Sequence, residues 1–200
     1  MVGPVAYRVL VDACALAPKT LRDWLLQLRL HGNADLFSLH YTEDTLAETI
    51  HTVRRMYPDL PGVDVTKIRD KIVNIMDDRI DDYGHGQEET TIKDPFDRHV
   101  HAAATDGQVD ILVTADTGFL QLDEVISDRF QYEIYHPDDL FLLVDDADPT
   151  LVQVVLQAQI AHRTKVGTPD YDFAGALRKS NCPQFADRIT RRLQQLALIR

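Results

Sequence analysis

Two short apolar runs that each lead into an acidic residue constrain this chain most. The first is Arg8–Ala13, in which Val9-Leu10-Val11 runs into Asp12, and the second is Val109–Thr114, followed closely by Asp116. Apolar runs of this length are typical of strands buried on both faces, as in parallel sheets covered by helices. A third strand-like run covers Tyr132–Tyr135. We therefore predict strands at all three positions.

Amphipathic helical patterns lie between these strands. The predicted helices run from Pro18 to about His31, from Thr42 to the Tyr57-Pro58 break, from Val65 to about Ile80, and from Asp94-Pro95 through Ala104. Thr42 is the expected N-cap of the second of these helices. Because strands alternate with helices, we predict an α/β fold with a mainly parallel central sheet flanked by helices and with right-handed crossovers.

The last quarter of the chain carries no strand pattern. The acidic stretch Asp145–Pro149 is interpreted as a linker, which divides the chain into residues 1–146 and a helical extension of residues 147–200. Three helical segments opened by Pro149, Pro169 and Pro183 are predicted in this extension. About fifty residues are too few for an independent core, so we expect these helices to pack on the first domain.

Composition and charge exclude several classes of protein. With a formal net charge of -11, the chain does not coat nucleic acid electrostatically, although a metal or a basic partner could supply positive charge locally. Only Cys14 and Cys182 are present, far apart, which argues against a disulfide framework or a structural zinc site. No basic leader and no stretch of ~20 apolar residues is visible, and we therefore expect a soluble, cytoplasmic protein without a membrane span.

Asp12 and Asp116 follow buried strands of one predicted sheet, and in parallel sheets ligands bind beyond the carboxyl ends of the strands. Either residue alone could instead cap the following helix or turn. Asp97 also has a capping interpretation, with Asp94 as N-cap, Pro95 at the first helical position and Asp97 at the third. Periodicity places Glu48 on the polar face of its helix, where it could simply face water.

The order of four motifs resembles the PIN-domain family. They are Val11-Asp12-Ala13, Leu46-Ala47-Glu48, Asp94-Pro95-Phe96-Asp97-Arg98-His99-Val100 and Val113-Thr114-Ala115-Asp116-Thr117-Gly118-Phe119. Within that family the chain is most similar to VapC-type toxins, from about Arg8 to Leu143. The tail resembles the extension of a longer PIN subgroup in Thr168-Pro169-Asp170 and Cys182-Pro183-Gln184-Phe185-Ala186. One departure is His101, where such proteins usually carry Leu or Ile.

This resemblance implies a PIN-like three-layer fold and a metal-binding active site. It implies metal-ligand or outer-shell roles for Asp12, Glu48, Asp97 and Asp116, and it places Thr114 beside them as a hydroxyl that orients metal or water. Carboxylates without a convergent His or Cys suit Mg²⁺ or Mn²⁺. The implied activity is a metal-dependent endoribonuclease that hydrolyses RNA, most simply the toxin of a toxin–antitoxin pair, with a small antitoxin as partner and a homodimer as its assembly.

Alternatives stay open at this point. A housekeeping PIN nuclease in RNA processing would use the same chemistry, and an inactive PIN-like binding module would not need the acids. A receiver-like phosphoacceptor expects a second acid beside the first, whereas Ala13-Cys14 follows Asp12. His99 and His101 lie two residues apart, so on a helix they do not face the same way and a paired metal site is disfavoured. Basic residues of the last helix, Arg188, Arg191 and Arg192, either contact RNA or form a solvated face.

Overall fold

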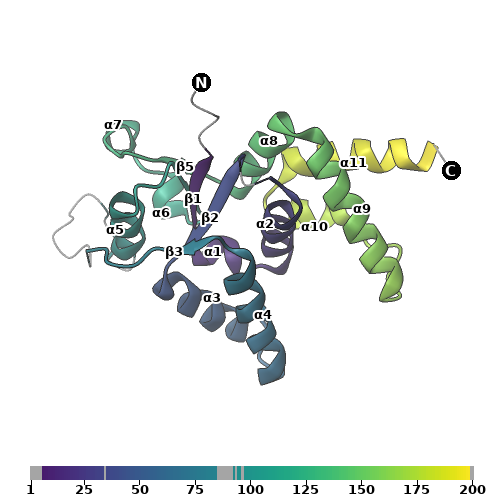
Figure 1. The fold of residues 1–200 in the computed structure, drawn as a ribbon, viewed down its shortest axis with the longest axis horizontal. Helices are drawn as coiled ribbons and strands as arrows, with labels where there is room; N and C mark the ends of the chain where they lie inside the picture. The colour runs from purple at the N-terminus through teal and green to yellow at the C-terminus, as the bar shows by residue number, and fades with distance from the viewer. Residues whose placement is uncertain (1–5, 34, 85–91, 93, 96, 199–200) are drawn as a thin grey trace.

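The computed structural model describes residues 6–33, 35–84, 92, 94–95 and 97–198. Within this part of the chain, five parallel strands form a central sheet (Figure 1). The strands are β1 (Tyr7–Val11), β2 (Phe37–Tyr41), β3 (Asp78–Arg79), β4 (Ile111–Val113) and β5 (Glu133–Tyr135). Their order across the sheet is β3-β2-β1-β4-β5. The predicted α/β class is confirmed.

Helices make up most of the remaining structure. Those of the first part of the chain are α1 (Ala13–Leu16), α2 (Lys19–His31), α3 (Glu43–Met56), α4 (Gly62–Ile75) and α5 (Arg98–Asp106). Those of the second part are α6 (Thr117–Leu120), α7 (Glu124–Ser127), α8 (Pro137–Ala147), α9 (Pro149–Lys165), α10 (Phe173–Lys179) and α11 (Pro183–Leu198). Thr42 caps α3 as predicted, by accepting a hydrogen bond from the Thr45 amide at 3.0 Å.

The alternation of strand side chains builds a core on each face of the sheet. Val9 and Val11 point into the larger core, which they share with α2, α8 and α9, whereas Leu10 and Leu112 point into a smaller core beneath α5. All four side chains are fully buried. Helices therefore cover both faces, and the expected three-layer arrangement is confirmed.

Two strands were not predicted from the sequence. In β2, Phe37, Leu39 and Tyr41 are buried, but the polar Ser38 and His40 interrupt the apolar run. The two-residue strand β3 is exposed and polar, and it is defined by its pairing with His40 and Tyr41. Neither segment carries the uninterrupted apolar pattern that revealed β1 and β4.

The boundaries of α4 and α5 differ from the prediction. The helix predicted to reach about Ile80 ends at Ile75, because Met76 takes an extended conformation and the chain then joins the sheet as β3. The helix predicted to start at Asp94-Pro95 starts at Arg98 instead. Asp94 accepts a hydrogen bond from the Asp97 amide at 3.1 Å in a turn, so Asp97 is the N-cap and not the third helical residue. The predicted capping arrangement at Asp94 is therefore wrong.

The acidic stretch after residue 144 is not a linker. Asp145 and Asp146 belong to the last turn of α8, and Asp148 follows that helix directly and caps α9. Asp145 is only 4% exposed, and its buried charge is balanced by ion pairs with Arg188 and Arg192 of α11. These two arginines are therefore partly buried and paired with acids, and they do not form a free basic face. The middle helix of the extension also starts later than predicted, at Phe173 and not at Pro169, after its cap Asp172.

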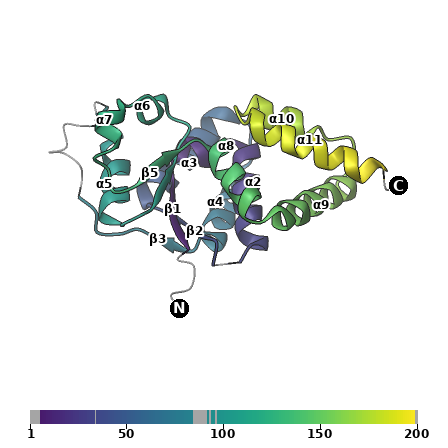
Figure 2. The same ribbon diagram turned by 90° about the horizontal axis from the view of Figure 1, so that it is seen from above.

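Helices α9 to α11 pack on the rest of the molecule, as expected for a segment without a core of its own. They lie together at one end of the molecule, beside α2 and α8 (Figure 2). Trp24 of α2 contacts Phe185 of α11, with ring centroids 5.0 Å apart, and both rings also contact Phe141 of α8. Among the described helices, none combines the length and the hydropathy that a bilayer-crossing segment requires.

Candidate active site

The strand order places a crevice between β1 and β4. The chain passes outward from β1 through β2 to β3 and then returns to β4 on the other side of β1. At such a reversal the connections leave the carboxyl ends of the two strands in opposite directions, and the space between them is open to ligands. Asp12 directly follows β1, and Thr114, Ala115 and Asp116 directly follow β4. Both predicted acids therefore lie at this crevice.

Asp12 joins the two strand ends through its carboxylate. Its Oδ1 accepts a hydrogen bond from the Ala13 amide at 2.6 Å, which caps α1. Its Oδ2 accepts hydrogen bonds from the hydroxyl of Thr114 at 2.7 Å and from the thiol of Cys14 at 2.9 Å. A carboxylate offers about four lone-pair positions, so these three hydrogen bonds leave one for a ligand. Asp12 is both a helix cap and a crevice residue.

Asp116 also combines a cap with a place in the crevice. Its Oδ1 accepts a hydrogen bond from the Gly118 amide at 2.5 Å, and its own amide donates to the Thr114 hydroxyl at 3.0 Å. Gly118 permits the acids to gather here, because a Cβ at this position would lie 2.8 Å from Asp116 Oδ1 and 3.3 Å from Asp97 Oδ2. A larger residue would force these side chains aside.

Asp97 makes no capping hydrogen bond with its side chain, although it is the N-cap of α5. Burial raises its pKa to about 6, with further contributions from the negative charges of Asp116, Asp94 and Asp12, and His99 opposes the change. A carboxyl group surrounded by other carboxylates holds its proton more tightly, since each added charge raises the free energy of the ionised form. A pKa raised by burial and by neighbouring carboxylates together is common at functional sites.

Glu48 reaches the same crevice from α3. Burial raises its pKa, the charges of Asp12 and Asp44 raise it further, and His99 lowers it. The Nε2 atom of His99 lies 3.6 Å from Glu48 Oε1, which is an ion-pair distance and too long for a good hydrogen bond. Sequence periodicity placed Glu48 on a polar face, and the structure shows that this face looks toward Asp12.

One cavity of about 480 Å³ contains the four predicted acids. It is lined by Asp12, Ala13, Cys14, Ala47, Glu48, His51, Thr52, Asp97 and Asp116. Thr114 lies behind this wall, fully buried and hydrogen-bonded to Asp12. Sequence reasoning missed His51 and Thr52, which could have been found from their spacing of three and four residues after Glu48 on one helix.

Comparison with known proteins identifies the family to which this chain belongs. A model of the PIN domain matches residues 8–118, more than half of the chain. The chain belongs to the PIN-domain family. Searches among curated proteins and among solved structures give no match. PIN domains are in general metal-dependent nucleases that act on RNA, and the matched segment contains all four acids of the cavity.

The side chains of this PIN domain suit a divalent cation in their chemistry. The facing donors are carboxylate oxygens, which Mg²⁺ and Mn²⁺ prefer. In the described part of the chain, however, no three His, Cys, Asp or Glu side chains meet closely enough to hold a metal ion. Carboxylates repel one another, and those of Asp12 and Asp116 are turned toward backbone amides. The donor type fits a divalent cation, and the acids would have to move closer together to bind it.

His101, the departure from the usual PIN pattern, is part of the smaller core. It is 9% exposed, its Nδ1 lies 2.6 Å from the Tyr132 hydroxyl, and its ring packs on Phe130 at 4.6 Å. His99 instead faces Glu48, so the two histidines point in different directions as predicted. The polar partner on Tyr132 explains how a histidine is accommodated in this apolar layer.

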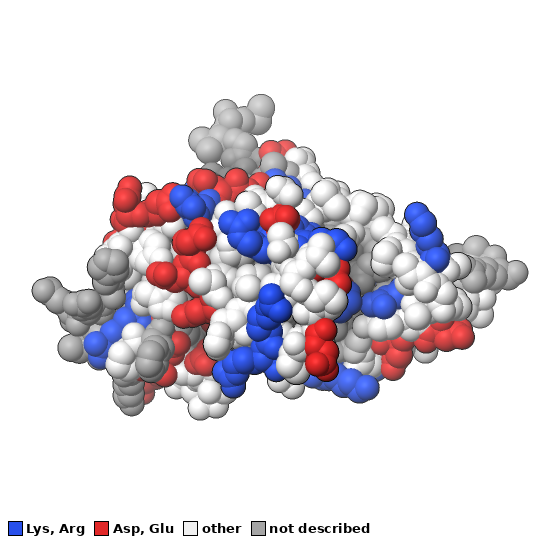
Figure 3. All heavy atoms as spheres, turned by 90° about the horizontal axis from the view of Figure 1, so that it is seen from below, with Lys and Arg blue, Asp and Glu red and all other residues white. Residues whose placement is uncertain are grey.

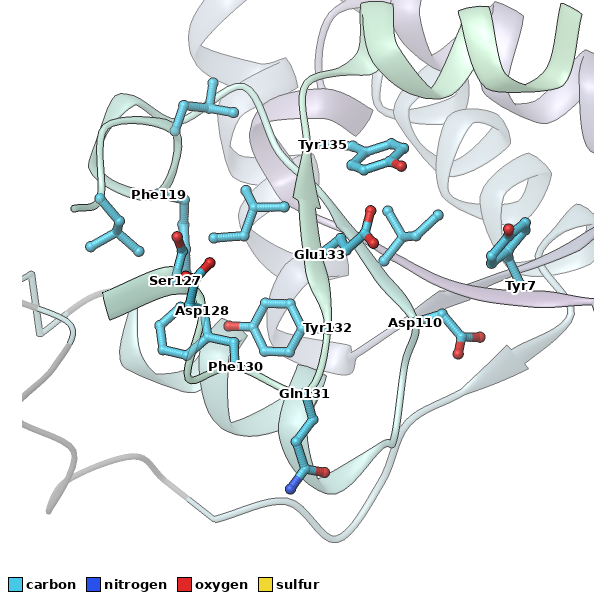
Figure 4. Close-up of a pocket in the computed structure, with 14 residues that line it drawn as sticks. Tyr7, Asp110, Phe119, Ser127, Asp128, Phe130, Gln131, Tyr132, Glu133 and Tyr135 are labelled. Carbon is cyan, nitrogen blue, oxygen red and sulfur yellow. The ribbon is translucent and has the colours of Figure 1, made fainter. Parts of the chain in front are cut away.

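A second hollow follows the edge strand β5, with a volume of about 750 Å³. Figure 4 shows Phe130 and Tyr132 on one side of β5 and Tyr7 and Asp110 on the other. None of the four predicted acids lines it; its own acids are Asp110, Asp128 and Glu133, of which Asp110 accepts a hydrogen bond from the Arg8 amide at 2.7 Å. The smaller cavity lies at the carboxyl ends of β1 and β4 and contains two carboxyl groups with a raised pKa, Asp97 and Glu48, so it is the better candidate active site.

Proposed function

We propose that this protein is a metal-dependent endoribonuclease that hydrolyses phosphodiester bonds of RNA. In this proposal Asp12, Asp97, Asp116 and Glu48 hold Mg²⁺ or Mn²⁺, and Thr114 supports them from behind. The observation that carries the proposal is that these four acids line one cavity at the crevice between β1 and β4. Membership of the PIN-domain family supports the same chemistry.

The hydrogen bonds of these residues indicate a different role for each of them. Thr114 donates to Asp12 and accepts from the Asp116 amide, which fixes the distance between the ends of β1 and β4. Asp97 and Glu48 carry no capping hydrogen bond in the described structure, so their oxygens are the ones that can adjust to a ligand. A bound divalent ion would supply the positive charge that activates a water molecule and stabilises the charge developing on the phosphate. His51 and Thr52 line the cavity and offer donors to phosphate oxygens.

The direct test is cleavage by purified protein. We expect cleavage of total RNA with Mg²⁺ or Mn²⁺ and none with excess chelator, because the carboxylates alone repel a phosphodiester. Asp12→Asn and Asp116→Asn should abolish cleavage while the circular dichroism spectrum is retained, and mapping of new 5′ ends would identify the bond. Undiminished cleavage in chelator, or in both variants in a contaminant-free preparation, would refute the proposal.

We further propose that the chain is the toxin of a toxin–antitoxin pair acting in the cytoplasm. The support is the likeness of its motifs to VapC-type toxins and the acidic cavity itself, since an Arg or Lys of a small antitoxin placed among carboxylates would replace the metal. Expression alone should arrest growth, and the small protein encoded beside it should restore growth. Harmless overexpression of active enzyme with no small protein co-purifying would contradict the toxin role.

The division of labour along the chain is also a proposal. Residues 1–146 would carry the catalytic groups, and residues 147–200 would be an extension that shares their core. A homodimer would fit the family resemblance. Sedimentation velocity of the wild-type protein measures the assembly directly, and a monomer at all concentrations would exclude the dimer.

A further inference from the structure

A second charged cavity lies between the catalytic part and the C-terminal helices. It has a volume of about 280 Å³ and is bounded by α2, α4 and α9. Its lining residues are Lys19, Asp23, Gln27, Lys71, Ala158, Gln159, His162 and Arg163. Residues from three helices far apart in sequence therefore converge here, and α9 contributes half of them.

The cavity is cationic although the protein as a whole is acidic. Lys19, Lys71 and Arg163 face a single carboxylate, Asp23, which leaves a formal local charge of +2 within a chain of -11. Asp23 forms ion pairs with both lysines, and Lys71 Nζ lies 3.1 Å from Asp23 Oδ1. One carboxylate cannot neutralise three cations, so the excess charge is available to an anion.

Two further side chains of the wall offer donors. The guanidinium of Arg163 lies over the ring of Tyr171, with Cζ 3.6 Å from the ring centroid. Stacking occupies the flat face of the guanidinium and leaves its N–H groups pointing outward in its plane. The side-chain nitrogen of Gln159 is buried and has no hydrogen-bond partner among the described residues. Buried donors in proteins are usually hydrogen-bonded, so the Gln159 amide is available to a bound acceptor.

One wall of the cavity, α2, follows closely after the acidic site in the chain. Lys19 begins α2, and only the four-residue α1 separates this helix from Asp12 and the carboxyl end of β1. In Figure 1, α3 and α4 extend to the lower side of the molecule, as does the end of α9 that carries Arg163. Figure 3 shows Lys and Arg side chains spread over the middle of the face seen from below; Asp and Glu are densest on the left of this view, and others lie among and to the right of the basic side chains.

We propose that this cavity binds a backbone phosphate of the RNA substrate at a distance from the bond that is cleaved. The proposal rests on the proposed nuclease function and extends it, because it makes the C-terminal helix α9 part of the substrate-binding surface. A phosphate presents several anionic acceptors, which match the lysines, the guanidinium edge and the amide of Gln159. Contacts of this kind fix the position of a strand without reading its bases.

The test uses full-length protein in an Asp116→Asn background with chelator, so that RNA is bound and not cut. Fluorescence anisotropy with a labelled single-stranded RNA measures Kd at several salt concentrations. Arg163→Gln should raise Kd roughly two- to fivefold at low salt, as expected for loss of one exposed ionic contact. It should also reduce the slope of log Kd against log salt by about 0.7.

Two further variants test whether the change in RNA affinity comes from the charge of this cavity. Asp23→Asn removes the one negative charge of the cavity and should tighten RNA binding, whereas a merely structural Asp23 predicts a lower melting temperature and unchanged Kd. Arg69→Gln is the matched control, because Arg69 is exposed on α4, two residues from Lys71, and does not line the cavity. Removal of this charge should leave Kd and the salt slope close to the parent values.

The outcomes separate this inference from the proposed function. If Arg163→Gln and Asp23→Asn bind RNA like the parent while the wild-type protein cleaves RNA, the inference is wrong and the nuclease stands. If the variants shift Kd as expected but wild type cleaves nothing with Mn²⁺, the phosphate site stands and the nuclease falls. If inorganic phosphate raises the melting temperature of the parent but not of Arg163→Gln, while RNA binding is the same in both, the cavity takes free phosphate and the inference is overturned.

Discussion

At the residue scale, the carboxylates of this site serve two purposes that sequence reasoning treats as alternatives. Asp12 and Asp116 each accept a hydrogen bond from a backbone amide at the start of a short helix, and each also lines the acidic cavity. Capping holds the carboxylate in a fixed orientation, and the strand end beneath it sets its position. A helix cap at the end of a buried strand is therefore no argument against a functional role.

Replacement of Asp116 distinguishes the two roles by the sign of a stability change. Asp116→Asn keeps an oxygen for the Gly118 amide but removes a charge beside Asp97, so in chelator it should melt at or above the wild-type temperature. Metal that binds only the folded state adds about 2.7 kcal/mol at one hundred times Kd, or several degrees. Differential scanning fluorimetry should show this shift with Mn²⁺ in wild type and lose most of it in Asp116→Asn.

Asp116→Ala is the companion variant, because it removes the cap as well as the charge. It should lose about 0.5–2 kcal/mol relative to Asp116→Asn in chelator. If wild type shows no Mn²⁺ shift at millimolar metal while both variants melt lower, Asp116 is only a structural cap.

At the element scale, the ion pair between Arg29 and Asp77 connects α2 to the sheet. Arg29 of α2 donates from Nε to Asp77 Oδ2 at 2.6 Å, and its Nη2 donates to Asp77 Oδ1. Asp77 also accepts a hydrogen bond from the Leu39 amide of β2 at 2.8 Å. Burial alone would raise the pKa of Asp77, but the Arg29 hydrogen bond and the Leu39 amide outweigh it and lower the pKa below its ordinary value.

This lowered pKa predicts how stability depends on pH. A carboxyl group with a lower pKa in the folded state stabilises the fold above its unfolded pKa, about 3.9, and this contribution is lost as the pH falls through the folded value. Asp77→Asn should therefore lower the urea midpoint at pH 7, and its deficit should shrink below about pH 4. Asp70→Asn, which removes an exposed partner of Arg69, is the control and should have little effect. An equal deficit at every pH would show that Asp77 acts through packing alone.

At the scale of the whole molecule, the C-terminal helices are part of the main core. Trp24, Phe141 and Phe185 come from α2, α8 and α11 and meet with ring centroids 5.0 to 6.5 Å apart. Phe185 is fully buried, and Asp138 of α8 accepts hydrogen bonds from the Gln184 and Phe185 amides at 3.1 and 2.9 Å. Loss of the extension would expose an apolar surface of α2 and α8.

We therefore predict that the chain unfolds as one cooperative unit. Phe185→Ala should cost about 3–5 kcal/mol, because it opens a cavity where three aromatic rings meet. Trp24 is the only tryptophan, so its fluorescence reports this junction, and it should change at the same urea concentration as the circular dichroism signal. Leu198→Ala, at an 87% exposed position of the same helix, should leave the midpoint unchanged. A fluorescence change well before the loss of helicity would instead indicate an extension that unfolds separately.

The sequence by itself determined the central strands, the helices that flank them and the acids at the strand ends. Val9–Val11 of β1 and all of β4 are buried, and these residues form continuous apolar runs. α2 and α3 bury one stripe each and carry clear start or stop signals. Asp12 and Asp116 were predicted because ligands of a parallel sheet bind beyond the carboxyl ends of its strands, and each acid comes shortly after such a strand end. These features depend on neighbours close in sequence.

Only the tertiary structure decided the features that depend on distant neighbours. β3 is a strand because β2 lies beside it, and the polar pair Asp78-Arg79 has no strand pattern of its own. Asp145 is buried in the last turn of α8, where Arg188 and Arg192 neutralise it from a helix about forty residues further along. Glu48 could not be distinguished from Glu43 and Asp44 by periodicity, and it faces the cavity because of where α3 packs against the ends of the strands. Local patterns record burial and capping, whereas convergence of charges is set by the path of the whole chain.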